Sequence, residues 1–511
     1  MPSQSPNIAA SAVAGIRWNY LGGVCASLCS VAIGIVLARI LGPRPFGQVI
    51  IASTVYGFVN LFVDGGFSQA LIQKPQLTPD QIRKTFTCQV TIGLLTTALV
   101  YVLAPFIAHR FHDPSAINVI RAMSAVILIQ STGLVSAALL RREMKFKRVQ
   151  YAALASYLLG FLVIGIPLAL YGAGVWSLVL AYLAQSTLNS ILLYLAARHT
   201  LLPLFGFPDR SITSFGGTII ANNLVNWGHS NLDNLAASSL GPASLGLYGR
   251  GCNFAYQPVN TVVTALQSVL LSSAAKVQHN QRLMRDLTLA VMGIVFGLLG
   301  AAYATFAMNS ATTIVGLYGD KWVGVIPLMI PFAIAMPFYG VHCLLGPILC
   351  GMGRPELEFW PQAISCALAA VAYFTAAHFS LISIAWALLF IMLLRFALIA
   401  AFTFRLLNIS WGETFMLLSK RVGFSAAFGA INWCADQSLR SLHVAAGLRL
   451  GVLFALSMTL LGWAIWSASH IVFGRQAVTF MLSYAGHLPS RYASRLRFQS
   501  GLSASPALTN A

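Results

Sequence analysis

Long apolar segments separated by short polar breaks follow one another along the whole chain. Each apolar run has about 20 residues or more, enough for one helix to cross a hydrocarbon core ~30 Å thick. Read against charged residues and Gly/Pro breaks, the pattern predicts about fourteen transmembrane helices in an all-α integral membrane protein. The predicted spans are 17–41, 47–72, 85–108, 116–140, 150–171, 173–196, 212–240, 243–275, 287–318, 324–351, 356–378, 381–405, 414–434 and 448–473.

A short motif occurs twice. Residues 41–47 read LGPRPFG and residues 240–246 read LGPASLG, so both match LGPxxxG at a separation of 199 residues. Weaker echoes pair residues 112–113 with 319–320, and 141–148 with 351–359. Six predicted spans separate the members of every pair, which indicates an internal duplication.

An even number of spans per repeat keeps the two copies parallel in the membrane. The chain is therefore expected to form two six-helix lobes around a central cavity, residues 17–196 and 212–405. Residues 414–473 then supply two extra helices of undefined role. Residues 1–16 are expected to be a cytoplasmic N-terminus without a signal peptide, and 474–511 a disordered cytoplasmic tail.

Composition and charge agree with a membrane protein. Of 511 residues, 58% are hydrophobic and 8% charged, too few polar side chains to cover a soluble globule. The net charge of +19 does not form one basic face with interleaved aromatics, which argues against nucleic acid as a partner. Of the 31 Lys and Arg, 22 fall on one side of the predicted membrane and six on the other, so both termini are predicted to be cytoplasmic.

The densest basic loop is RREMKFKR at 141–148. It is interpreted as a topological anchor or as a site for an anionic lipid head. The eight cysteines fall in apolar segments without metal-ligand spacing, so they are expected to be buried core residues, and no metal site is predicted.

Two predicted spans carry polar stripes, although a charge near the bilayer centre costs about 2.5–3.5 kcal/mol on insertion scales. Steps of three and four place each set on one helical face. Such residues either join helices by hydrogen bonds or line a water-filled cavity, and six in register along span 8, at positions 250, 253, 257, 260, 264 and 267, favour a cavity that binds polar cargo. The candidate substrate-cavity residues are Asn222, Asn226, His229 and Asp233 in span 7, and Arg250, Asn253, Gln257, Asn260 and Gln267 in span 8.

The remaining three of the 31 Lys and Arg, all arginines, lie within spans. Asp233 and Arg250 are about equally far from the turn at 241–242, so they are expected to lie level, either as a permanent salt bridge or as a pair that opens when an anionic head group arrives. Arg395, in the middle of span 12, should face a partner or the cavity. The third charge, Arg39, lies near the outer end of span 1, where it can snorkel.

No nucleotide-binding, protease or hydrolase motif occurs, and the loops are too short for a membrane glycan enzyme, so a transporter without a cofactor is predicted. Coupling to a proton or sodium gradient would use Asp64, Asp233 or His229, and Asp64 and Arg39 are also candidate gating residues. Because Gly65 and Gly66 follow Asp64, that carboxylate can equally cap a helical break.

Several runs together resemble a known family. They are LARILGPRPFGQV at 37–49, DGGFSQALIQKP at 64–75, LLRREMKFKR at 139–148 and NLDNLAASSLGPASLGLYGR at 231–250. The chain is similar over residues 10–475 to the Wzx-type oligosaccharide flippases of the multidrug/oligosaccharidyl-lipid/polysaccharide exporter superfamily.

The resemblance implies a transporter of the bacterial cytoplasmic (inner) membrane that works by alternating access. Its cargo would be an undecaprenyl-pyrophosphate-linked oligosaccharide repeat unit, moved from the inner to the outer leaflet for exopolysaccharide or lipopolysaccharide biosynthesis. Expected partners are membrane lipids, a polysaccharide polymerase and glycosyltransferases of the same pathway. The alternatives are a multidrug exporter of the same superfamily and a membrane glycan polymerase or ligase.

Overall fold

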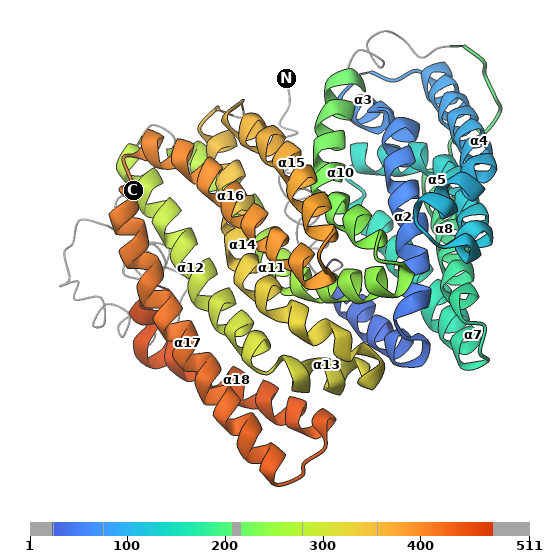
Figure 1. The fold of residues 1–511 in the computed structure, drawn as a ribbon. Coiled ribbons are helices and arrows are strands. Elements are labelled where there is room, and N and C mark those ends of the chain that lie inside the picture. Colours follow the sequence, from blue (N-terminus) through green and yellow to red (C-terminus); the bar gives the residue numbers. More distant parts are fainter. Residues whose placement is uncertain are drawn as a thin grey trace. The chain divides into compact units, whose positions relative to one another are not determined.

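The computed structural model describes residues 23, 25–74, 76–206, 216–277, 280–354 and 356–473. Throughout these residues the regular elements are helices (Figure 1), which confirms the all-α prediction. The predicted N-terminal segment 1–16 and tail 474–511 lie outside the described residues.

The chain groups into two compact units, unit 1 at residues 1–250 and unit 2 at residues 251–511. Helix α11 (Pro242–Val277) begins in unit 1 and continues in unit 2. The lobes predicted from the repeat have their boundary at 196–212 instead. The division into units follows contacts, whereas the lobes follow the repeat, so the lobe assignment stays a prediction.

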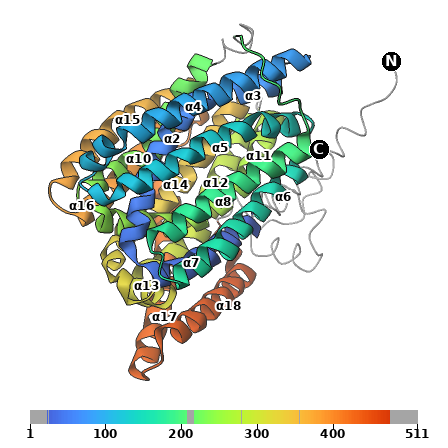
Figure 2. The same cartoon turned by 90° about the vertical axis from the view of Figure 1, so that its right-hand side faces the viewer.

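Unit 1 is organised around α5, which contacts α2, α3, α4, α6 and α8 (Figure 2). Small residues let the helices approach: Gly93 of α4 faces Ser131, and Gly133 faces Ser190 of α8. The elements of unit 1 are the helix Cys25–Leu41, α2 (Pro43–Asp64), α3 (Phe67–Gln73), α4 (Pro79–Arg110), η1 (Pro114–Ala116), α5 (Ile117–Arg142), α6 (Phe146–Tyr157), the π-helical η2 (Leu158–Gly165), α7 (Ile166–Leu170), α8 (Val175–Ala197) and α10 (Gly216–Ser238).

Unit 2 has α12, α14 and α16 in mutual contact, with α15 against α16 and α17 against α12. The burial is deepest in α12 and α14, where 72% of the most apolar stretch lies inside the protein. Its elements after α11 are α12 (Gln281–Met308), α13 (Ser310–Tyr318), η3 (Asp320–Leu328), α14 (Met329–Gly351), α15 (Glu356–Ala377), α16 (Leu381–Leu407), α17 (Trp411–Ser441) and α18 (Ala446–Val472).

The two C-terminal helices are fastened to unit 2 through a G-x-x-x-G pair on α12. A Cβ added at Gly293 would lie 2.1 Å from the Phe473 carbonyl oxygen, and one at Gly297 would lie 1.9 Å from the Val472 oxygen. Only glycine permits this approach. The end of α18 is thus packed closely against α12, although only 11% of the most apolar stretch of α18 lies inside the protein.

Each of the fourteen predicted spans overlaps a described helix. Within the described residues, ten helical stretches are long and apolar enough to cross a membrane, which confirms a multi-pass protein. The helix Cys25–Leu41, α10, α11 and α17 are not among the ten long spans. The first is short in its described part and the others carry many polar residues, so the number of fourteen crossings stays a prediction.

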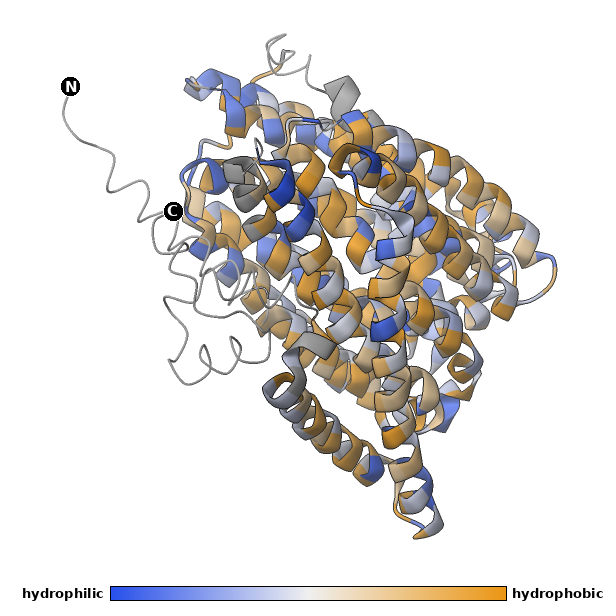
Figure 3. Ribbon diagram, turned by 90° about the vertical axis from the view of Figure 1, so that its left-hand side faces the viewer, coloured by the Kyte–Doolittle hydropathy of each residue, from blue (hydrophilic) through white to orange (hydrophobic). Residues whose placement is uncertain are grey.

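Hydrophobic residues dominate the helical ribbons (Figure 3), and many large apolar side chains are exposed. The prediction that the cysteines are buried is wrong for Cys25, Cys350 and Cys434, which are exposed, and right for Cys252. An apolar segment of a membrane protein can face lipid as well as protein, so hydropathy alone does not predict burial.

Candidate functional site

The two copies of LGPxxxG pack against each other in unit 1. A Cβ added at Gly47 would lie 1.7 Å from the Pro242 carbonyl oxygen, and one at Gly246 would lie 2.0 Å from the Pro43 oxygen. Each copy therefore presents its second glycine to the first proline of the other. We call this reciprocal contact, made by Pro43, Gly47, Pro242 and Gly246, the repeat junction.

The motif explains its own local structure. Gly42 and Gly241 have φ angles of 76° and 91°, which side-chain-bearing residues rarely adopt. The proline that follows each of them starts a helix, because its fixed φ suits the first turn and its missing N–H has no helical acceptor there. The same turn thus begins both α2 and α11 and brings their N-terminal ends together.

From the repeat junction toward the C-terminal end of α2, α2 and α10 lie side by side (Figure 1). The Thr54 hydroxyl donates to Asn231 Oδ1 over 3.5 Å, and the Phe58 and Trp227 rings have centroids 5.0 Å apart. The contact between the two helices is therefore partly polar and partly aromatic.

Three polar atoms on these two helices are buried without a hydrogen-bond partner: Asn60 Oδ1, Trp227 Nε1 and Asn234 Oδ1. Such groups are rare in proteins, because each loses its hydrogen bonds to water when it is buried. They indicate a place where water or a ligand supplies the missing partner. Unit 1 has further atoms of this kind, on Gln89, Arg121 and Asn189 among others, and we call the three on α2 and α10 the open polar atoms of unit 1.

The polar stripe predicted on span 7 is helical as expected, but its two ends differ. Asn222 and Asn226 are exposed, whereas His229 and Asp233 are buried. Asp233 accepts hydrogen bonds from the Tyr248 hydroxyl over 3.1 Å and from the Asn234 amide over 2.8 Å. The carboxylate is thus held by groups of α10 and α11.

Arg250 reaches toward the first two spans. Its guanidinium carbon lies 5.3 Å from the centre of the Phe46 ring, a cation–π geometry. It also lies against Gly34, where an added Cβ would be 2.5 Å from Arg250 Nη2. The predicted pair between Asp233 and Arg250 stays a prediction, because the contacts seen for the two groups are with these other partners.

The continuation of the span 8 stripe in unit 2 has mixed surroundings. Asn253 and Asn260 are exposed and Gln257 is half-buried. Asn260 Oδ1 accepts from the Tyr339 hydroxyl over 3.3 Å, and Gln267 donates to the Cys343 carbonyl over 3.1 Å. The C-terminal part of the stripe, at Asn260 and Gln267, therefore forms hydrogen bonds with α14. The exposed Asn253 remains accessible to solvent or a ligand.

A tyrosine of α12 is inserted into the middle of this stripe. Its hydroxyl, on Tyr303, donates to the Ala255 carbonyl and accepts from the Val259 amide over 3.2 Å. In a regular helix these two backbone groups would bond to each other. With Pro258 between them, α11 has an identifiable kink site.

Arg395 is buried on α16, as expected of a residue that needs a partner. Its Nη2 lies 3.0 Å from His342 Nε2 of α14, and Nη1 lies 4.0 Å from Met392 Sδ. Among the described residues no carboxylate forms an ion pair with it. His342 escaped the sequence reasoning, although a lone histidine in an apolar span is itself a signal.

The two candidate gating residues lie at helix ends. Asp64 is the last residue of α2 and accepts from the Ser68 hydroxyl of α3 over 2.5 Å, across a break made by Gly65 and Gly66. Arg39 is exposed near the end of the first helix. Their predicted roles are not tested by this geometry, but the position of Asp64 matches the alternative of a helical break.

A family model described as "Polysaccharide biosynthesis protein" matches residues 36–327. The chain belongs to this family. The match confirms the resemblance to Wzx-type flippases that the motifs indicated.

Curated relatives agree. The succinoglycan biosynthesis transport protein ExoT of Rhizobium meliloti is 27% identical over 64% of this chain and 66% of the relative, just under two thirds of its length. TuaB, a teichuronic acid biosynthesis protein of Bacillus subtilis, is 24% identical over 88% and 93%. WzxC, a lipopolysaccharide biosynthesis protein of Escherichia coli, is 21% identical over 68% and 71%.

Solved structures confirm the fold. The lipid II flippase MurJ, in an inward closed conformation, has a TM-score of 0.71 at 11% identity, covering 89% of this chain and 99% of that one. An inward-facing multidrug transporter of the MATE family has a TM-score of 0.59 at 16% identity, covering 75% and 94%. These likenesses show that the chain shares the fold of the two transporters.

Proposed function

We propose that the protein is a flippase that moves an undecaprenyl-pyrophosphate-linked oligosaccharide repeat unit from the inner to the outer leaflet of the bacterial inner membrane, for exopolysaccharide or lipopolysaccharide biosynthesis. The names of ExoT and WzxC and the fold of MurJ support a lipid-linked glycan as cargo. The distribution of Lys and Arg supports a cytoplasmic position for both termini.

The observation that carries the proposal is the set of open polar atoms of unit 1. An amide oxygen and an indole N–H suit the hydroxyls of a sugar, and guanidinium groups such as that of Arg250 bind phosphate through two parallel hydrogen bonds. The prenyl tail of the cargo needs no polar contact and stays in lipid. Water or glycan then completes the hydrogen bonds that Asn60, Trp227 and Asn234 lack.

Alternating access requires a contact that closes one side and opens again. The repeat junction suits the outer side, where the predicted topology places residues 42–46 and 241–242. Its closeness depends on two glycines. The cation–π contact between Arg250 of α11 and Phe46 of α2 spans the same two helix ends, and it would have to break when they separate. At the other end of α10, exposed polar residues such as Asn222 and Asn226 extend the proposed path of the glycan.

A reconstituted transport assay tests the function. Proteoliposomes of the full chain would receive a polyprenyl-pyrophosphate trisaccharide, and its appearance in the opposite leaflet would be measured with a lectin that does not cross the bilayer. We expect translocation by the protein and none in empty liposomes. Arg250→Gln should slow it about tenfold, since a hydrogen bond to a charged group contributes about 1.5–3 kcal/mol.

Parallel samples separate the alternatives. Uptake of a cationic dye without movement of the glycan lipid would identify a multidrug exporter and overturn the proposal. New glycosidic bonds in the product would identify a polymerase or ligase. A transport rate that depends on an imposed proton or sodium gradient, with the dependence lost in Asp233→Asn or Asp64→Asn, would establish ion coupling. Co-purification of the protein with a polymerase or glycosyltransferases would identify these as its partners.

A further inference from the structure

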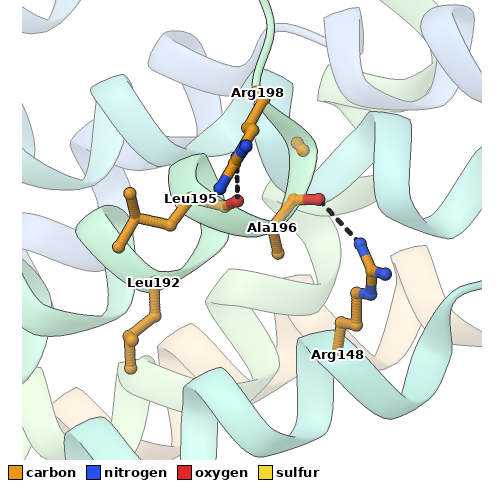
Figure 4. Close-up of a pocket in the computed structure, with 6 residues that line it drawn as sticks. Arg148, Leu192, Leu195, Ala196 and Arg198 are labelled. Atoms are coloured by element: carbon orange, nitrogen blue, oxygen red, sulfur yellow. Dashed lines mark hydrogen bonds between the residues drawn. The ribbon is translucent and has the colours of Figure 1, made fainter.

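A groove opens where α6 begins and α8 ends, in the part of unit 1 that holds the basic loop (Figure 4). Its volume is about 620 Å³, within the range of about 300–1,000 Å³ typical of small-molecule sites. One arginine from each helix end borders it, and leucines and alanines of α8 form the rest. The lining residues are Arg148, Leu192, Leu195, Ala196, Ala197 and Arg198.

Backbone carbonyls of α8 hold both arginines in place. Arg148 Nη1 donates to the Ala196 oxygen over 3.0 Å, and Arg198 Nε donates to the Leu195 oxygen over 3.3 Å (Figure 4). A guanidinium has five N–H donors, so each group retains several for a ligand. The end of α8 therefore positions both guanidinium groups and leaves most of their N–H donors available to a ligand.

The charge of the groove is uncompensated. No acidic residue lines it, and in the described part of the chain neither arginine forms an ion pair. The C-terminus of α8 contributes only about half a negative charge. Other basic residues of the loop are engaged elsewhere: Arg142 binds the Leu71 and Lys74 carbonyls, and Lys145 pairs with Glu143 over 2.5 Å.

Arg198 has a backbone conformation that suits glycine better. Its φ is 51° and it occupies the C-cap of α8 in the left-handed region. Glycine is the usual residue there, because a Cβ is disfavoured. An arginine is therefore an unusual residue for this position.

The apolar part of the groove selects the kind of anion. Leu195 is 54% exposed and its neighbour Ile191 is 48% exposed on the same helix, and Leu192 is half-buried. Together they offer a surface for hydrocarbon directly beside the two cations. A free phosphate would use only the cations, whereas a phospholipid would use both parts.

We propose that this groove is a binding site for an anionic phospholipid, with the phosphodiester between Arg148 and Arg198 and an acyl chain along Leu192 and Leu195. The site lies in the helix end that the predicted topology places at the inner leaflet. It is separate from the open polar atoms and does not depend on the identity of the transported cargo.

The test is a titration of the purified full chain, in neutral detergent, with dioctanoyl phosphatidylglycerol. Binding is measured by calorimetry. Arg148→Gln together with Arg198→Gln should weaken it about 25-fold, taking roughly fivefold for each basic residue near an anionic lipid. The matched control is Arg141→Gln with Lys147→Gln, which removes the same amount of charge from the basic loop beside Arg148 but from residues that do not line the groove.

Arg198→Gly separates binding from folding. Glycine fits the left-handed C-cap, so thermal stability should stay equal or rise while binding falls about fivefold. Glycerol phosphate and dioctanoyl phosphatidylcholine should both bind at least tenfold more weakly than phosphatidylglycerol.

Two results would overturn the proposal. An equal loss in the Arg141/Lys147 control would reduce the effect to general surface charge. Glycerol phosphate that binds as tightly as the lipid would make the groove a site for a free anion.

Discussion

Two of the helix contacts that depend on glycine, the repeat junction and the contact of α12 with the end of α18, differ in what surrounds them. At the repeat junction the glycine Cα atoms face proline carbonyl oxygens, and in unit 2 the glycines of α12 face carbonyl oxygens at the end of α18. The imagined Cβ-to-oxygen distances are nearly the same, 1.7–2.0 Å at the junction and 1.9–2.1 Å in unit 2. Closeness of packing alone therefore does not distinguish a fixed contact from one that opens.

The neighbouring polar groups do distinguish them. In unit 2, Asp436 accepts from Thr312 over 2.8 Å and pairs with Arg449 over 3.3 Å, and Asn432 accepts from Ser457 over 2.9 Å. The exceptions on α12, α17 and α18 are the Ser425 hydroxyl and the Nε atoms of Arg285, Arg421 and Arg449. On α2 and α10, by contrast, Asn60, Trp227 and Asn234 have atoms that lack partners. A contact whose polar groups are satisfied belongs to the scaffold, and one whose polar groups are open is suited to a ligand.

The sharpest test places the same side chain in both contacts. Gly297→Val forces a Cβ against the Val472 oxygen in a closed core, and we expect a loss of about 1–3 kcal/mol or more, as overpacking causes. Gly47→Val should instead reduce the transport rate more than tenfold and leave stability nearly unchanged. The reason is that the two helix ends at the repeat junction can relieve the clash by staying apart. Thermal unfolding and the leaflet assay measure the two effects. Equal loss of stability in both variants would remove the contrast.

Removing one partner of the buried pair in unit 2 tests the scaffold role. Asp436→Asn leaves Arg449 without its carboxylate in a site where the two side chains are 6% and 13% exposed. We expect a loss of about 3 kcal/mol, the cost of an uncompensated buried charge. The midpoint of thermal unfolding checks this, and Asp64→Asn, at the partly exposed end of α2, serves as the control that should change it little. A stable Asp436→Asn variant would show that α17 and α18 are not held in this way.

Much of the fold, including the turns that begin α2 and α11, could be predicted from the sequence. Apolar run lengths predict the helices, and the repeated LGPxxxG predicts a common turn, because glycine and proline dictate backbone geometry locally. That the two copies meet each other was not predictable. A repeat indicates similar structure, whereas contact between copies depends on the packing of whole helices.

The polar stripes show the same limit. Periodicity places Asn222, Asn226, His229 and Asp233 on one face, but burial along α10 changes midway because its neighbours change. His342 and Tyr303 were missed because each stands alone in an apolar helix. Pro258 was the available signal for Tyr303, since a proline inside a helix leaves backbone groups that another residue can bond.

A pair of asparagines sharpens the comparison of open and satisfied groups. Asn432→Leu removes an amide whose oxygen and nitrogen are both bonded, leaving Ser457 and the Phe428 carbonyl without it, and should cost about 1–3 kcal/mol. Asn60→Leu removes an oxygen that has no partner, so stability should be unchanged or higher. Transport should fall several-fold in Asn60→Leu only. If Asn60→Leu destabilised the protein as much as Asn432→Leu, the open polar atoms would be structural.

The smallest effect is expected at His199, a buried group of unit 1 that does have a partner. Its Nε2 lies 3.0 Å from the Ser136 hydroxyl, just beyond the end of α8, and burial lowers the pKa of the imidazole below its usual 6.5. The folded protein then binds fewer protons than the unfolded chain, so stability is present above pH 6.5 and decreases as the pH falls below it. Unfolding midpoints at pH 7.5 and 5.5 should differ less in His199→Gln than in the wild type, while His378→Gln, at an exposed position, keeps the full difference. His199, like Asp436, has a hydrogen-bond partner, so its titration should change stability and leave the transport rate per folded molecule unaltered. A transport rate that followed the same titration would instead assign His199 to the moving part of the protein.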